Sequence, residues 1–192
     1  MIEIFKKEIS ESIKVKQLLL DSSDNLIVLE ELVSECIKSL KNAGKIIFCG
    51  NGGSFADSQH LTAEFISKLR FDRSPLPAIA LGTNSSNLTA IGNDYGFEYI
   101  FERELIALYG KNDVFIPIST SGNSQNVIRA IKKAKELNIK TFGLTGIDGG
   151  KMEDLCFTIK VPSAKTEKIQ ECHIMIGHIV CHLIESNLFN KK

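Results

Sequence analysis

A histidine and a glutamate in the first half of this sequence have the types and spacing of metal ligands or acid–base catalysts. They are His60 and Glu64, in the segment FCGNGGSFADSQHLTAEF (48–65). In a helix this spacing places both side chains on one face, about 40° apart, where they can bind one divalent metal ion. A His–Glu pair exposed to solvent at this spacing is also ordinary in helices, so the pair alone leaves both interpretations open.

A second group of polar side chains lies in an otherwise apolar helical segment, KIQECHIMIGHIVCHLIE (168–185). Gln170 and His178 are eight residues apart, which places their Cα atoms about 12 Å apart in a helix. A metal ion shared between them would need two extended side chains. We interpret the other two histidines of the segment, His173 and His182, as packing or surface residues.

A hydroxyl-rich loop, ISTSGNSQNV (118–127), follows an apolar run and opens a predicted helix. Its hydroxyls surround Gly122 and belong to Ser119, Thr120, Ser121 and Ser124. Neutral donors at the positive end of a helix dipole form an anion site. The loop lacks the GK[ST] sequence of nucleoside triphosphate-binding loops, so a phosphate monoester is the expected ligand. A serine-rich helix cap without a ligand is the alternative.

The loop GNGGS (50–54) follows the first apolar run in the same way. Gly50 and Gly52 match a dinucleotide-binding fingerprint, but Phe55 occupies the third glycine position, which disfavours NAD binding. We expect the glycines to let backbone amides approach a sugar or its phosphate. The expected contact region includes Ser54 at the end of the loop.

The elements that must position these residues alternate between helix and strand after a helical start. Apolar residues recur at helical spacing over 2–20 and 25–42. Short apolar runs, typical of strands covered on both faces, follow at 45–49, 77–81, 113–118, 140–145 and 156–161. Helical patterns separate most of them, at 54–69, 85–107 and 124–137, and one follows the last at 166–188. The alternation predicts an α/β fold with a five-stranded parallel doubly wound sheet, preceded by two helices.

Length and composition limit the functional classes. A chain of 192 residues without a Pro/Gly/Ser-rich linker predicts one domain over 1–192, with a helical pair at 1–43 and an α/β core at 44–188. Lys+Arg and Asp+Glu both number 23, which argues against nucleic acid as a partner. No apolar run is long enough to span a membrane. Five cysteines without a CxxC pair favour buried thiols in the cytoplasm.

Together these motifs make the chain, from about residue 25 to 188, resemble the bacterial phosphoheptose isomerases of the sugar-isomerase (SIS) superfamily. The resemblance rests on CGNGGSFADSQHLTAE, AIGNDYGFEYIFERE, ISTSGNSQNVI, LTGIDGGKM and IQECHIMIGH. The loop STSGNS by itself indicates only a SIS domain, whereas HxxxE together with IQExHxxxxH indicates the heptose enzymes. Lys68 and Lys168 stand where similar proteins are expected to carry arginine.

The resemblance implies conversion of sedoheptulose 7-phosphate to D-glycero-D-manno-heptose 7-phosphate, for lipopolysaccharide core or capsule. It implies a cytoplasmic homotetramer with active sites at subunit interfaces and one Zn²⁺ per site. The implied metal ligands are His60, Glu64, Gln170 and His178. The implied substrate contacts are Asn51, Gly52, Gly53, Asn93, Asp94, Ser119, Thr120, Ser121, Ser124 and Gln170.

For the isomerisation, Glu64 is the candidate base and His178 the candidate acid, because a proton must move between C1 and C2 through an enediol(ate). Two alternatives remain open at this point. One is a non-catalytic SIS-fold binding protein, like the bacterial replication-initiator-associating protein. The other is a SIS enzyme acting on another sugar phosphate, such as a hexulose or arabinose phosphate.

Overall fold

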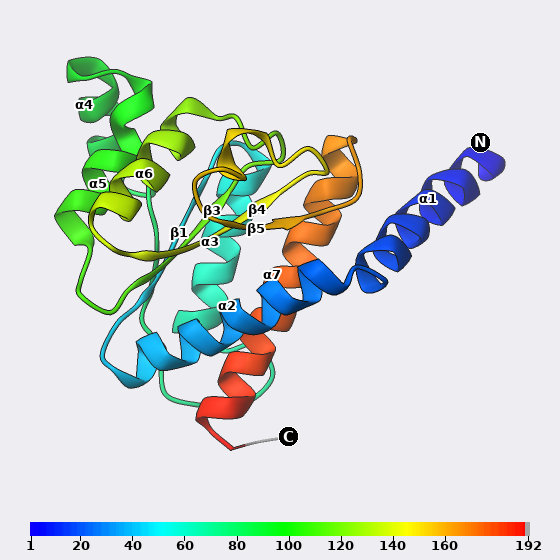
Figure 1. Cartoon of the computed structure of the whole chain (residues 1–192), viewed down its shortest axis with the longest axis horizontal. Helices are drawn as coiled ribbons and strands as arrows, with labels where there is room; N and C mark the ends of the chain where they lie inside the picture. Colours follow the sequence, from blue (N-terminus) through cyan, green and yellow to red (C-terminus); the bar gives the residue numbers. More distant parts are fainter. Residues whose placement is uncertain (191–192) are drawn as a thin grey trace.

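A computed structural model describes residues 1–190 and contains one five-stranded sheet with helices on both faces (Figure 1). The strands are β1 (Ile46–Gly50), β2 (Ala78–Ala80), β3 (Val114–Ile118), β4 (Lys140–Thr145) and β5 (Phe157–Lys160). Their order in the sheet is β2-β1-β3-β4-β5, and every neighbouring pair is parallel. The predicted fold class and all five predicted strands are confirmed.

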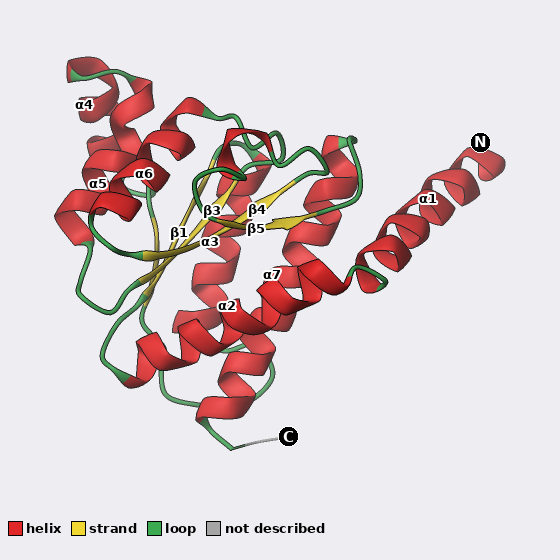
Figure 2. Cartoon of the chain, viewed as in Figure 1, coloured by secondary structure: helices red, strands yellow, loops and turns green. Residues whose placement is uncertain are grey.

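The helices cover the two faces of the sheet in separate groups (Figure 2). The main helices are α1 (Ile2–Leu20), α2 (Ser23–Lys41), α3 (Gly53–Ile66), α4 (Ser85–Asp94), α5 (Ile100–Leu108), α6 (Gln125–Glu136) and α7 (Thr166–Leu188). One buried cluster joins α2, α3 and α7 to one face of the sheet, and a second cluster joins α5 and α6 to the other.

The central strands are buried because their sequences are apolar on both sides. Every residue of β1 and β3 is buried, as the near-continuous runs IIFCG and VFIPI predict. Side chains of these strands alternate between the two clusters: Ile46 and Phe48 contact the α2/α3/α7 side, and Ile47 and Cys49 the opposite side. Parallel strands covered in this way direct all their carboxyl ends to one edge of the sheet.

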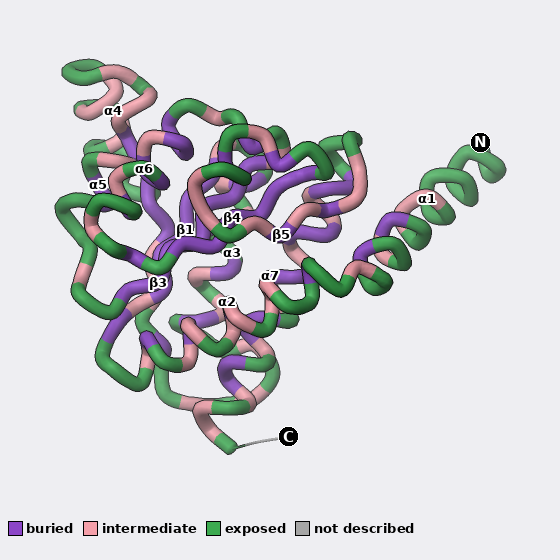
Figure 3. Tube along the Cα trace, in the orientation of Figure 1, coloured by how far each residue is buried: buried purple, intermediate pink, exposed green. Residues whose placement is uncertain are grey.

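Helix α1 differs from the rest because it projects away from the sheet and most of its residues are exposed (Figure 3). Its exposed apolar side chains include Ile2, Phe5, Ile9 and Ile13. Within the described residues, no helix combines the length and the apolar character needed to cross a bilayer. The division into one domain with a helical pair and a core stays a prediction.

Candidate functional site

The HxxxE residues and the last helix meet in the folded chain. His60 and Glu64 come from α3, His178 comes from α7, and their ligand atoms all lie within 4.8 Å of one another. The Nε2 atoms of His60 and His178 are 2.9 Å apart, and His60 Nε2 lies 3.4 Å from Glu64 Oε1. We call these three residues the His–Glu–His group; one chain supplies all of it.

The His–Glu–His group lies at the surface, but its three side chains differ in how far they are exposed to solvent. The side chain of His60 is 50% exposed, whereas that of Glu64 is 16% exposed and His178 is half-buried. Solvent and a small ligand therefore reach the imidazole of His60, while the carboxylate is held against the protein. Two imidazoles and a carboxylate are the ligand types of catalytic zinc sites.

The fourth predicted ligand, Gln170, lies near the start of α3. A β-carbon placed on Gly53 would be 2.2 Å from Gln170 Nε2, so the amide packs directly over this glycine. Gly53 precedes His60 by seven residues, or about 10 Å along the helix. The amide of Gln170 therefore lies beside the predicted substrate loop, and its role as a metal ligand stays a prediction.

The hydroxyl-rich loop follows β3 and lines a cavity of about 270 Å³ at the carboxyl edge of the sheet. Thr120 and Ser121 contribute to its wall, whereas Ser119 is buried and its Oγ lies 3.0 Å from Ser124 Oγ. Gly122 has φ of +63°, and a β-carbon there would meet the carbonyl oxygen of Gly149 at 1.9 Å. This turn is therefore possible only with glycine.

Other segments complete the wall of this cavity. They are residues 146–148 after β4, and four residues before and within the start of α7, namely Ser163, Ala164, Thr166 and Ile169. Residues 146–148 belong to the quoted motif LTGIDGGKM, whereas no pattern in the sequence marks Ser163 or Thr166 as cavity residues. Ile169 lines the cavity and is followed directly by Gln170, so the cavity and the Gly53 contact are adjacent on α7.

The GNGGS loop is held by an amide pair that sequence analysis missed. The Asn51 and Asn126 side chains donate to each other reciprocally, at 2.8 and 2.9 Å, which ties the loop after β1 to the first turn of α6. Gly52 has φ of +56° and precedes α3, and Ser54 is buried. Asn126 stands inside the quoted motif ISTSGNSQNV. Its pairing with Asn51 depends on the order of the strands, because β1 and β3 are neighbours in the sheet and the loops that follow them therefore lie side by side.

Asn93 and Asp94 lie apart from the other predicted contacts. Both are exposed at the end of α4, where Asn93 Nδ2 donates to Asp94 Oδ1 at 2.8 Å. Helix α4 lies at one end of the molecule, well apart from α7 (Figure 1). A single chain therefore does not bring this pair to the His–Glu–His group.

Three further polar residues lie near the site, and one of them, His173, is the packing residue that the sequence analysis predicts. His173 is fully buried and bonded through Nε2 to the Thr145 carbonyl at 3.2 Å, and burial lowers its pKa to about 4. Burial also raises the pKa of Asp57, and the nearby His60 opposes this shift.

Lys168 contacts α1, through the Glu8 carbonyl and the Ser12 hydroxyl. Lys168 therefore anchors α1 to α7.

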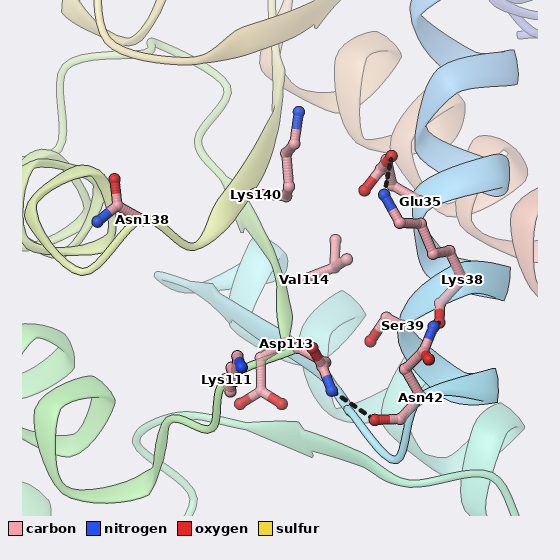
Figure 4. A pocket seen from close by; sticks show the side chains of 10 residues that line it. Glu35, Lys38, Ser39, Asn42, Lys111, Asp113, Val114, Asn138 and Lys140 are labelled. Carbon is pink, nitrogen blue, oxygen red and sulfur yellow. Dashed lines mark hydrogen bonds and ion pairs between the residues drawn. The ribbon is translucent and has the colours of Figure 1, made fainter.

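A different cavity, of about 180 Å³, lies at the opposite edge of the sheet (Figure 4). It is lined by Val114 and Lys140, the first residues of β3 and β4, and by the ion-paired side chains of Glu35 and Lys38. Ligands of parallel α/β sheets bind beyond the carboxyl ends of the strands. This cavity is therefore not the candidate site.

Comparison with known proteins gives concordant results. A family model described as "SIS domain" matches residues 12–146. A phosphoheptose isomerase from Aneurinibacillus thermoaerophilus is 49% identical over 193 residues, covering 100% of this chain and 98% of the relative.

Two solved structures resemble the whole fold. A phosphoheptose isomerase from Neisseria gonorrhoeae superimposes with a TM-score of 0.88 at 41% identity, and one from Francisella tularensis with a TM-score of 0.91 at 32% identity. Each match covers 96% of this chain and 98% of the other.

Proposed function

This chain belongs to the phosphoheptose isomerases of the SIS-domain family, and from this membership we propose that it converts sedoheptulose 7-phosphate to D-glycero-D-manno-heptose 7-phosphate. The observation that carries the proposal is the meeting of His60, Glu64 and His178 on two helices that begin beside a hydroxyl-lined cavity. The alternative of a non-catalytic binding protein is not favoured, because the matched relatives are named as isomerases.

The reaction moves one proton between neighbouring carbons. In the ketose-to-aldose direction, the Glu64 carboxylate removes a proton from C1 and returns it to C2. His178 donates a proton to the C2 oxygen, which neutralises the enediolate. It then accepts the proton of the C1 hydroxyl while Glu64 protonates C2, and the aldehyde forms. Glu64 and His178 are close enough to act on adjacent atoms of one substrate.

The donor set fits a zinc ion. Zinc ligands at about 2.0–2.1 Å in tetrahedral geometry are about 3.3 Å from one another. The 2.9 Å separation of the two imidazole nitrogens is shorter by a few tenths of an ångström, which a small rotation of either ring supplies. We propose that His60, Glu64 and His178 hold the ion, with Gln170 as the fourth predicted ligand; His178 would transfer protons only while its Nε2 is not bound to the ion. When bound, Zn²⁺ polarises the carbonyl and stabilises negative charge on the enediolate oxygens.

The length of α3 from Gly53 to His60 is close to the length of the substrate. Seven residues separate Gly53 from His60, which is about 10 Å along α3. An extended chain rises by about 1.2 Å per bond, so the eight bonds from C1 to the phosphorus of a heptose 7-phosphate also span about 10 Å. We therefore propose that the phosphate binds at Ser119, Thr120, Ser121 and Ser124 while C1 and C2 reach Glu64. Between its phosphate and C1, the substrate would pass the loop residues Asn51, Gly52, Gly53 and Ser54.

We further propose a homotetramer with sites completed by neighbouring protomers. Helix α1 exposes apolar side chains along most of its length, and an apolar groove of about 310 Å³ lies between α2 and α7. Burial of α1 in a second copy would remove this apolar surface from water. In such an assembly, Asn93 and Asp94 of one protomer can reach the site of another. The variant Ile9→Glu/Ile13→Glu should then dissociate the tetramer, as measured by light scattering.

A cytoplasmic location is part of the same proposal. All five cysteines are free thiols and four of them are buried, as expected in a reducing compartment. The product would supply nucleotide-activated heptose for lipopolysaccharide core or capsule.

The deciding experiment is to incubate the purified protein with sedoheptulose 7-phosphate and follow formation of the aldose. We expect conversion, loss of conversion after treatment with a chelator, and recovery when Zn²⁺ is added back. Absence of conversion by the metal-loaded protein would reject the proposed activity. Conversion that survives complete metal removal would reject the metal but leave the isomerase.

A further inference from the structure

Arg73 and Glu185 form an ion pair that is almost fully enclosed. Arg73 lies in the segment between α3 and β2, and its Nε donates to Glu185 Oε2 at 3.0 Å. The side chains are 2% and 0% exposed. Dehydration offsets most of the attraction in a buried pair, so stabilisation alone is a weak reason for it.

The guanidinium of Arg73 caps the end of α3 that carries Glu64. Nη2 donates to the Glu64 carbonyl and Nη1 to the Phe65 carbonyl, each at 2.8 Å. The last carbonyls of a helix have no partners within it, and a positive charge there is favourable. The last turn of α3 contains no basic residue of its own. Arg73 therefore supplies the cap and holds the backbone of Glu64 directly.

Glu185 connects this cap to α7. It follows His178 by seven residues, nearly two turns, so both side chains project from the same face of the helix. Its Oε1 accepts from the Arg70 backbone N–H at 2.9 Å, and its Oε2 also accepts from Leu69 N–H at 3.4 Å. One carboxylate thus joins α7 to both Arg73 and the chain that leaves α3.

We infer that the Arg73–Glu185 pair is a positioning device for the His–Glu–His group. It fixes the spacing of α3 and α7 two turns from His178 and thereby sets the separation of the Glu64 carboxylate from the His178 ring. The inference rests on the proposed function, because it assigns the pair a role at that site. The phosphate-binding loops lie at the other end of these helices and do not depend on it.

The test replaces the pair without leaving a buried charge, in the variant Arg73→Met/Glu185→Met. We expect Zn²⁺ affinity, measured by competition with a chromophoric chelator, to fall about tenfold or more, the range for residues that orient metal ligands. The visible spectrum of the Co²⁺-substituted protein should change, and kcat should fall while KM stays near the wild-type value. Arg73→Lys, which keeps the charge but loses the planar fork, should give a smaller effect of the same kind.

The matched control is Arg129→Met/Glu102→Met, which removes another Arg–Glu pair between helices, on the opposite face of the sheet. It should bind Zn²⁺ as the wild type does. Wild-type Zn²⁺ affinity and Co²⁺ spectrum in folded Arg73→Met/Glu185→Met would overturn the inference while leaving the isomerase intact. If that variant does not fold, the same wild-type values in Arg73→Lys would overturn it. A wild-type protein that neither binds Zn²⁺ nor isomerises the substrate would instead reject the proposed function, and the inference with it.

Discussion

Gly177 of α7 and Leu61 of α3 are in such close contact that a β-carbon on Gly177 would lie 2.4 Å from Leu61 Cδ2. Both residues adjoin the candidate site, since Leu61 follows His60 and Gly177 precedes His178. The missing side chain lets the two helices approach closely, and this approach brings the two imidazoles together. A glycine inside a helix is intrinsically unfavourable, so its use here has a packing reason.

Replacing Gly177 by alanine should therefore destabilise the protein and disturb the site. The added methyl group overpacks the α3/α7 contact, which costs about 1–3 kcal/mol. Chemical denaturation measures this change, and chelator competition measures the accompanying loss of Zn²⁺ affinity. Gly92→Ala is the matched control, because it lies in α4 with no atom within 4 Å of the new carbon and should be neutral or stabilising. Equal stability of the two variants would contradict the packing argument.

Gly53→Ala should impair substrate binding through Gln170. The new methyl group would overlap the Gln170 amide, which must then move away from the substrate loop. Because Gly53 is exposed, we expect KM to rise severalfold with little change in the free energy of unfolding. In the background of Gln170→Ala, the same change should have no further effect on KM. An undiminished effect in that background would exclude Gln170 as the intermediary.

Removing either proposed proton-transfer group should abolish turnover and leave the fold intact. Glu64→Gln and His178→Gln keep the approximate size of each side chain but remove its proton-transfer capacity, so kcat should fall by at least about 10²-fold. Circular dichroism and thermal unfolding verify the fold. His182→Gln, on the same helix but bonded to Ser186, is the control and should retain activity. Near wild-type activity in either test variant would refute the role assigned to that residue.

His173 should make stability fall as the pH is lowered. Its pKa is about 4 in the folded protein, compared with an ordinary value of 6.5, so the unfolded state binds the proton first. Stability is therefore complete above about pH 6.5 and is lost progressively as the pH falls to 4. The contribution is about 2 kcal/mol between pH 7 and pH 5. Denaturation curves of the wild type and of His173→Gln, measured over this pH range, separate the contribution of His173 from the contribution of the carboxylates. If the free energy of unfolding of both proteins depended on pH in the same way, the prediction for His173 would be wrong.

The sequence by itself determined the order and type of the elements. Helical periodicity over 2–20 and 25–42, and apolar runs such as KIIFC, are local patterns, and local patterns specify local structure. The parallel sheet then followed from the alternation of strand and helix, and with it the edge at which the loops GNGGS and STSGNS lie. The HxxxE spacing also placed His60 and Glu64 on one helix face.

The tertiary structure decided how distant residues meet, although the family resemblance already implied that His60, Glu64 and His178 share a site. His60 and His178 are 118 positions apart, and their contact depends on the packing of α3 against α7 at Gly177 and on the Arg73–Glu185 pair. No periodicity encodes such a contact, because it results from the shapes of two helix surfaces. The same reason applies to three other findings that only the folded chain shows. They are the pairing of Asn51 with Asn126, the contact of Lys168 with α1, and the position of Asn93 away from the other predicted contacts.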